Sequence, residues 1–210
     1  LGDVYKRQVQ AAAQLAETGI SLQKLQKGSP NHAEWLASHL NPGDAVAIDA
    51  NVLSLAEQDR LLDAFDEVAG EDEEGIRLIT EQDLLTELWQ DRPALPTAPL
   101  YAHDEQFLSQ SAKEKLADVR AQMQEIGVTH HLVSSLDDIA WLTNLRGNDV
   151  DYNPVFLAHM LITADKATLY IDNNKVGDDI AKLLADAGID VAEYDQVQSA
   201  LSQLTPEDLL

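Results

Sequence analysis

Three prolines within seven residues, Pro93, Pro96 and Pro99, constrain the fold of this chain more than any other feature. Proline has no backbone N–H and fixes φ, so this spacing cannot continue a helix or a central strand. We therefore expect residues 92–110 to form an extended, proline-rich linker. The linker separates residues 9–91 from residues 111–210, two parts that are each long enough for a domain.

The first part alternates short apolar runs with amphipathic stretches, which is the order of a layered α/β domain with a mixed sheet. Strands are expected at residues 20–25, 45–48 and 76–79. Helices are expected at residues 9–17, after the cap Asn31, after the cap Ser54 and at residues 83–89. In the helix after Ser54, we expect four side chains to face inward: Leu55, Leu61, Leu62 and Phe65.

The second part has the same alternation of strands and helices. A helix should begin after Ser111 and end at Gly127, and another should open at Ser135. Residues 155–163 and 167–171 are expected to form a hairpin. The remaining elements are a strand at 129–134, a helix at 175–187, a strand at 190–194 and a helix after Asp195.

Both ends of the chain look cut. Residues 1–8 contain no initiator Met and no clear period, so we interpret them as a non-native lead and leave them out of the fold. Residues 204–210 begin like a helix and then stop. The acidic residues 71–74 are interpreted as a solvated loop.

The charge balance argues against two classes of partner. The chain has 14 Lys and Arg against 37 Asp and Glu, a net charge of −23. Such a surface repels phosphate backbones and anionic lipids, so we expect no nucleic-acid partner and no membrane partner. The chain has no Cys, which excludes disulfides and thiolate metal sites and fits a reducing, cytoplasmic location.

Catalytic and metal-binding patterns are absent from the sequence. There is no His-Glu-x-x-His pattern, and the neighbours His130 and His131 face opposite sides of a strand. Asp137 and Asp138 follow Ser135 at a helix start, where they complement the helix dipole. No Gly-x-Ser-x-Gly elbow or phosphate-binding loop occurs. We therefore predict no catalytic residue and no metal ligand in this chain.

Residues 141–156 allow both a structural and a ligand-binding interpretation. They place aromatic side chains, amides, Arg146 and two Asp in a loop between apolar elements. The guanidinium of an arginine there can donate hydrogen bonds to a carboxylate or a backbone carbonyl of a ligand. It can equally pair with Asp149 or Asp151 and have only a structural role. The residues alone leave both alternatives open.

Residues 137–156, DDIAWLTNLRGNDVDYNPVF, resemble the LDDIAWLxNLRGxDVxxNPVF stretch of Xaa-Pro aminopeptidases. Shorter similarities to the same family occur elsewhere within residues 9–194, in the same order along the chain as in the family. They lie at residues 10–15, 35–36, 46–49, 84–93 and 113–120. The chain is thus similar to the N-terminal portion of an aminopeptidase P.

The resemblance implies two creatinase/prolidase N-terminal-like domains, each a ribonuclease H-like α/β fold with a mixed sheet flanked by helices. Residues 9–91 would be the C-terminal part of the first domain, which is incomplete, and residues 111–210 would be the second. The catalytic pita-bread domain, with two Mn²⁺ ions, would be absent. The parent enzyme would remove the N-terminal residue from peptides with proline in second position, would be cytoplasmic and would form a homodimer, whereas this fragment alone would be inactive.

The resemblance also implies a role for the loop. We expect Arg146, Asp149 and Asn153 to line or brace the wall of the substrate cleft, and Trp141 and Phe156 to serve packing. An alternative is a catalytically inert, peptidase-like module that binds a protein or peptide partner. The metal ligands of the parent protein would distinguish the two.

Overall fold

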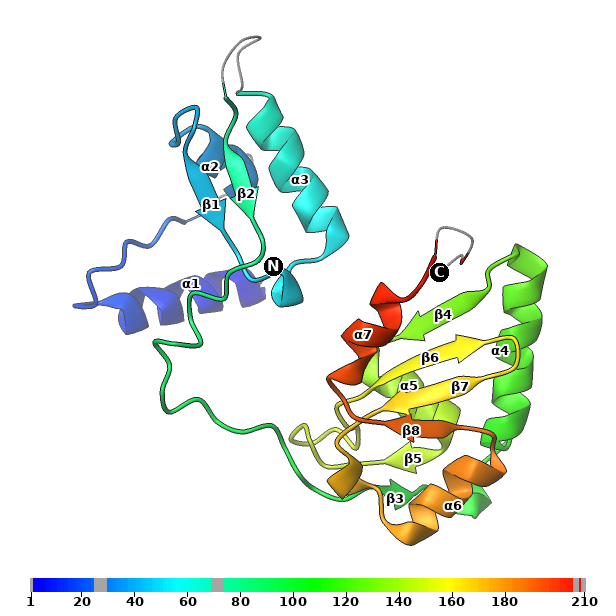
Figure 1. Cartoon of the computed structure of the whole chain (residues 1–210). Coiled ribbons are helices and arrows are strands. Elements are labelled where there is room, and N and C mark those ends of the chain that lie inside the picture. Colours follow the sequence, from blue (N-terminus) through cyan, green and yellow to red (C-terminus); the bar gives the residue numbers. More distant parts are fainter. Residues whose placement is uncertain (1, 25–29, 69–73, 206–207, 209–210) are drawn as a thin grey trace. The chain divides into compact units, whose positions relative to one another are not determined.

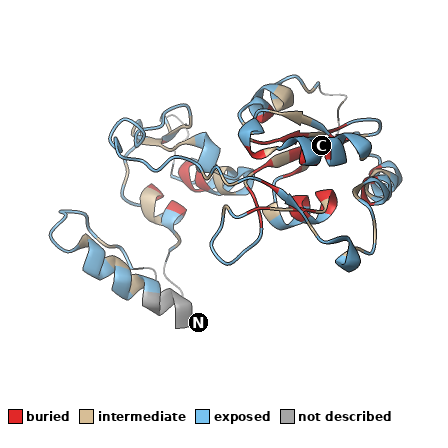
Figure 2. Ribbon diagram, turned by 90° about the horizontal axis from the view of Figure 1, so that it is seen from below, coloured by how far each residue is buried: buried red, intermediate tan, exposed pale blue. Residues whose placement is uncertain are grey.

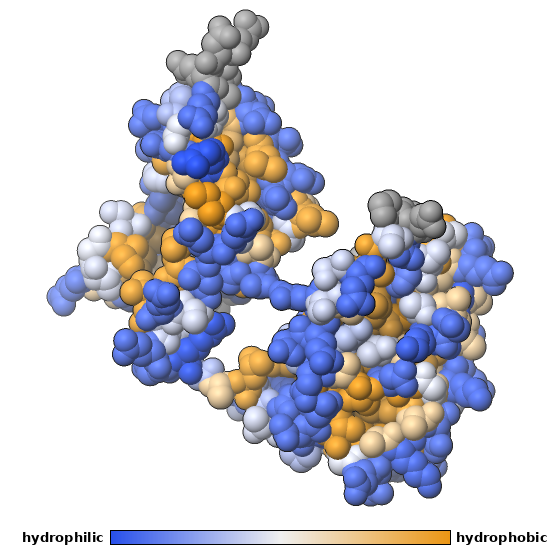
Figure 3. Space-filling view, viewed as in Figure 1, coloured by the Kyte–Doolittle hydropathy of each residue, from blue (hydrophilic) through white to orange (hydrophobic). Residues whose placement is uncertain are grey.

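The chain folds into two compact units, residues 1–93 and residues 94–210, in a computed structural model (Figure 1). The structure describes residues 2–24, 30–68, 74–205 and 208. Residues 94–110, which the sequence assigns to the linker, belong to the second unit. Hydrophilic side chains are spread over the visible surface of each unit, and smaller groups of apolar side chains lie among these hydrophilic side chains (Figure 3).

The first unit contains two parallel strands, β1 (Ala45–Ala47) and β2 (Arg77–Ile79), with Val46 opposite Leu78. Its helices are α1 (Gly2–Leu15), α2 (His32–Ala37) and α3 (Leu55–Asp66), and a 3₁₀ turn, η1, spans Ala50–Val52. Caps were predicted correctly, because Asn31 and Ser54 accept backbone N–H groups at the starts of α2 and α3. The core consists of Ala33, Ala37, Leu61, Ala64, Phe65 and Ile76.

Several expectations for the first unit were wrong. Residues 20–24 form no strand, and Leu25 lies outside the described residues. Residues 83–89 form turns rather than a helix, because the Asp83 carboxylate accepts the N–H groups of Leu85 and Thr86 and competes with a helical turn. Leu55 and Leu62 are exposed, since the buried face of α3 runs through Leu61, Ala64 and Phe65.

One further difference concerns the sheet, and one observation concerns the lead. Residues 2–8, set aside as a non-native lead, form the first half of α1. In the described part of this unit the sheet has only the parallel pair β1 and β2, so it is not mixed.

The second unit is built on a mixed sheet in the order β4-β6-β7-β8. β4 (His130–Val133), β6 (His159–Thr163) and β7 (Ala167–Tyr170) are antiparallel neighbours, and β8 (Asp190–Ala192) pairs with β7 in parallel. The hairpin of β6 and β7 and the mixed α/β architecture are therefore confirmed. A separate short pair joins β3 (Tyr101–Ala102) to β5 (Leu145–Arg146).

Helices cover both faces of this sheet (Figures 1 and 2). Because successive side chains alternate between faces, one face of β6 and β7 presents Met160, Ile162 and Leu169 to the main core. That core includes side chains from α4 (Ala112–Ile126), α5 (Leu136–Thr143) and α6 (Asp178–Asp186). On the other face, Leu161 and Tyr170 pack with Val197 of α7 (Gln196–Ser202).

Local signals in the second unit were mostly predicted correctly. Ser111 and Glu114 form a capping box at the start of α4, and Gly127 ends that helix with a φ of 78°. The helix expected from residue 175 begins at Asp178, because residues 173–175 form the 3₁₀ turn η3 (Asn173–Lys175) under the cap Asp172. A second 3₁₀ turn, η2, spans Glu105–Phe107.

In the part of the chain that the structure describes, no helix combines the length and the apolar character required to span a membrane.

Candidate functional site

The site predicted from the sequence begins at the C-terminal end of α5, where two cations hold the last carbonyl groups of the helix. Arg146 Nη1 donates to the carbonyl oxygens of Ala140 and Leu145, each at 2.8 Å. Lys115 Nζ, from α4, donates to the Trp141 carbonyl oxygen and to Asn144 Oδ1, each at 2.6 Å. The Trp141 carbonyl also accepts the Asn144 N–H at 3.3 Å, and the two cations complement the negative end of the helix dipole.

Arg146 therefore binds backbone carbonyls of its own unit, and its suggested pairing with Asp149 or Asp151 was wrong. Its guanidinium is half-buried and is held between α5 and β5. The side chain fixes the direction in which the chain leaves α5. Arg146 thus braces the segment that follows it.

Lys115 is the second brace, and its surroundings are unusual. The residue is 3% exposed, and its Nζ lies 4.3 Å from the centre of the Trp141 ring, which is a cation–π contact. Burial lowers the pKa of Lys115, and the nearby charge of Arg146 lowers it further. The ammonium is stabilised here by carbonyl oxygens and an aromatic face.

Asp149 anchors the far side of the loop 147–154. Its side chain is fully buried and forms an ion pair with Lys175 of η3, whose side chain is 2% exposed. The same oxygen, Oδ2, accepts the Leu157 N–H at 2.7 Å. The other oxygen, Oδ1, is buried and has no hydrogen-bond partner among the described residues. This buried pair joins the loop to a segment 26 residues further along the chain.

The backbone of the loop 147–154 folds back on itself. Gly147 N–H donates to the Pro154 carbonyl at 3.3 Å, and Asp149 N–H donates to the Val155 carbonyl at 3.2 Å. Val150 and Asn153 form an isolated antiparallel bridge. A Cβ at Gly147 would lie 2.7 Å from Phe156 Cβ, so only glycine allows this close approach.

The three predicted site residues therefore have different positions. Arg146 is half-buried and Asp149 is fully buried, whereas Asn153 is exposed at the tip of the loop beside Asp151 and Tyr152. The sequence analysis did not identify Lys115, Lys175 or Tyr152. Lys115 lies in a stretch that carries the family resemblance, but no local pattern links Lys175 to Asp149.

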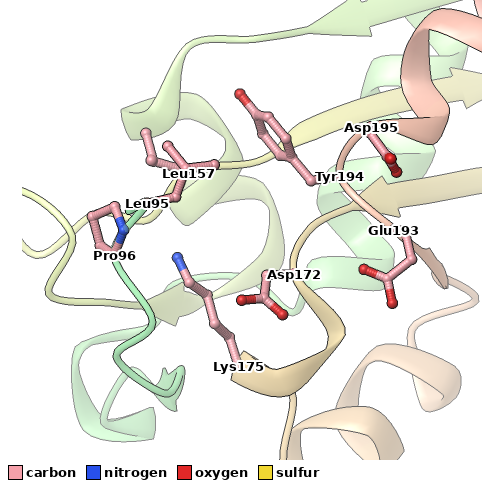
Figure 4. Close-up of a pocket in the computed structure, with 8 residues that line it drawn as sticks. All are labelled: Leu95, Pro96, Leu157, Asp172, Lys175, Glu193, Tyr194 and Asp195. Atoms are coloured by element: carbon pink, nitrogen blue, oxygen red, sulfur yellow. The ribbon is translucent and has the colours of Figure 1, made fainter. Parts of the chain in front are cut away.

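A cavity of about 380 Å³ lies next to this anchor (Figure 4). Leu157 and Lys175, which both contact Asp149, form part of its wall. The other lining residues are Leu95, Pro96, Asp172, Glu193, Tyr194 and Asp195. The cavity is mainly apolar on one side, with carboxylates at its edge.

A Ser–His contact near the cavity does not form a catalytic triad. Ser134 Oγ and His159 Nδ1 are hydrogen-bonded at 2.8 Å, and burial lowers the pKa of His159. A nucleophilic serine needs a histidine that a third polar group orients. Here the imidazole packs against the Tyr194 ring, with 5.0 Å between ring centres. The pair stabilises the adjoining ends of β4 and β6.

Within the described ranges, no three His, Asp or Glu side chains come together in a group that could hold a metal ion.

Comparisons with known proteins place the chain among peptidase relatives. Residues 91–209 match the family described as "Creatinase/Prolidase N-terminal domain". "Probable Xaa-Pro aminopeptidase P" of Sordaria macrospora is 35% identical over 186 residues, which are 88% of this chain and 30% of that protein. "Aminopeptidase P2" of Arabidopsis thaliana is 32% identical over 197 residues, 93% of this chain and 27% of that protein.

A solved structure agrees with the fold. The X-prolyl aminopeptidase of Caenorhabditis elegans, described as a cytosolic enzyme with a di-nuclear active site, superposes with a TM-score of 0.77 at 22% identity. The match covers 85% of this chain and 28% of that one. The chain thus spans less than a third of the length of these relatives.

Proposed function

The chain belongs to the creatinase/prolidase N-terminal domain family, and from this premise we propose that it is the non-catalytic N-terminal part of a metal-dependent Xaa-Pro aminopeptidase. The parent enzyme removes the N-terminal residue from peptides with proline in second position. Two relatives that carry this activity in their names support the proposal over most of the chain.

The catalytic domain, in this proposal, lies outside the chain and binds two Mn²⁺ ions. The C. elegans neighbour, with its di-nuclear site and cytosolic location, supports a metal-dependent, cytoplasmic parent. Residues 9–91 and 111–210 are then two ribonuclease H-like domains joined by the linker 92–110, with residues 1–8 as a non-native lead. The first domain is incomplete, and the parent is a homodimer.

The loop 147–154 is proposed as a wall of the substrate cleft. The observation that carries this role is the contrast within the loop between a buried base and an exposed tip. Arg146 and Asp149 fix the base through the carbonyls of α5 and the Lys175 ammonium. Asn153 presents its amide at the tip, where it can meet a peptide.

Two substitutions in the full-length protein test this proposal. Asn153→Ala should raise KM for an Xaa-Pro peptide by about fivefold, because one hydrogen bond contributes about 1 kcal/mol, and kcat should stay within twofold. Gln124→Ala, which removes an exposed amide from α4, is the matched control and should change neither constant. Arg146→Ala should lower stability and raise KM together, since its loss frees the base of the loop.

Equal KM values for the Asn153→Ala variant and the unmodified protein would exclude the cleft role of that residue. The parent activity has its own test. Full-length protein supplied with Mn²⁺ should release the first residue of an Xaa-Pro peptide, whereas the 210-residue chain should not. A full-length protein without this activity would favour the inert binding module instead.

A further inference from the structure

Tyr152 is the single aromatic residue of the loop 147–154 and lies at its exposed tip. Its accessible area is 107% of the reference value, so the ring packs against nothing in its own unit. Aromatic side chains normally bury much of their surface, and burying such a ring is strongly favourable. A ring held fully in solvent contributes nothing to the stability of the unit that carries it.

The backbone at Tyr152 is also unfavourable. Its φ is +64°, in the left-handed region that bulky residues rarely adopt. Holding such a residue there costs on the order of 1–2 kcal/mol, and it persists only where the surroundings determine the conformation. Tyr152 therefore costs stability through its backbone and gains none through its ring.

The rest of the loop fixes this conformation. Asn153 N–H donates to the Val150 carbonyl at 3.2 Å, and Val155 N–H donates to the Asn153 carbonyl at 2.8 Å. Asp149, directly before this turn, is held by the buried Lys175 ammonium. The ring thus projects from a restrained backbone, and an aromatic side chain with two χ angles loses little entropy when it binds a ligand.

We propose that Tyr152 is a specificity-determining residue whose ring stacks on the proline ring of the peptide substrate, an inference that rests on the proposed function. Aromatic faces bind proline rings in several kinds of peptide recognition. In an Xaa-Pro peptide the first side chain varies, and the proline ring is the constant group. An aromatic ring carried on a fixed backbone suits a constant partner better than a variable one.

The test uses the full-length protein and peptides with proline in second position. Tyr152→Ala should raise KM three- to tenfold with kcat within twofold, the range for loss of one ring–ring contact. Tyr152→Phe keeps the ring and should keep KM. Phe107→Ala removes another exposed aromatic ring of the same unit, 68% exposed on η2, and should leave KM unchanged.

A second ligand distinguishes proline from other parts of the peptide. A peptide with alanine in second position is measured as a competitive inhibitor. If the ring of Tyr152 contacts proline, Tyr152→Ala weakens binding of the proline peptide and leaves that of the alanine peptide unchanged. Equal weakening of both peptides would overturn the proposal.

Tyr152→Gly separates recognition from folding. Glycine adopts φ of +64° freely, so this variant should unfold at a higher urea concentration than Tyr152→Ala, while both variants lose the same factor in KM. Unchanged KM in both variants, with a wild type that cleaves Xaa-Pro peptides, would refute the role of Tyr152 alone. A wild type that cleaves no such peptide would refute the proposed function.

Discussion

Replacing Asp149 by Asn should destabilise the second unit by about 3–5 kcal/mol, the usual cost of removing one partner from a buried ion pair. The side chains of Asp149 and Lys175 are 0% and 2% exposed, so water cannot replace the lost charge. Asparagine keeps the shape of the side chain and can still accept the Leu157 N–H. The loss therefore arises from an ammonium left buried without its counter-ion.

A double-mutant cycle isolates this pair. Lys175→Met removes the ammonium, and the double variant Asp149→Asn/Lys175→Met carries no buried charge at this position. Since the pair is in direct contact, the double variant should lose about 2 kcal/mol less than the sum of the two single variants. Amide hydrogen exchange of β6 and β7 at increasing urea reports the unfolding free energy of this unit alone.

An exposed pair gives the matched control. Glu57 and Arg60 of α3 form an ion pair with side chains 26% and 54% exposed, and Glu57→Gln should cost less than about 1 kcal/mol in the first unit. Additive losses in the Asp149–Lys175 cycle, or a single-variant cost below 1 kcal/mol, would refute the view that this ion pair anchors the loop.

Two other substitutions give further tests. Gly147→Ala should lower the unfolding free energy of the second unit by about 1–3 kcal/mol in a urea titration, because the new Cβ would lie 2.7 Å from Phe156 Cβ. Gly177→Ala is the control and should cost less, because the space around its Cβ is open. His159→Gln should reduce the loss of stability on acidification. Burial holds the pKa of His159 below its ordinary value of 6.5, so the unfolded chain binds the proton first and wild-type stability falls as the pH drops below about 6.5. Identical pH profiles for wild type and His159→Gln would contradict this reasoning.

Local chemistry made much of the second unit predictable from the sequence. The capping box of Ser111 with Glu114 and the left-handed Gly127 are signals that act within a few residues, so both ends of α4 were located. The β6–β7 hairpin follows from two apolar runs around a polar turn. Such features depend little on the rest of the fold.

The first unit was predicted less well because its elements depend on distant partners. Residues 20–24 have a strand-like alternation, but a strand forms only where another strand can pair with it. Residues 83–89 have helical composition, yet the Asp83 side chain stabilises a turn instead. Residues 20–24 lack a pairing strand and residues 83–89 have a competing contact, so local propensity alone did not decide either segment.

In the candidate site, too, local features were predictable and long-range contacts were not. The motif around Arg146 and Asp149 was recognisable, but its partners were not. Lys175 lies 26 residues from Asp149, and no periodicity relates the two. The sequence therefore located the loop, whereas the packing of η3 and α4 determined which of its side chains are buried.

The contact of Trp141 with Lys115 gives the second unit an intrinsic optical reporter. Trp141 is the only tryptophan among residues 94–210, and its ring contacts the Lys115 ammonium, which donates to a carbonyl at the C-terminal end of α5. Indole emission is sensitive to a charge at this distance and to the solvent that reaches the half-exposed ring. With Trp35 and Trp89 replaced by phenylalanine, fluorescence would follow the base of the loop directly, without an attached dye.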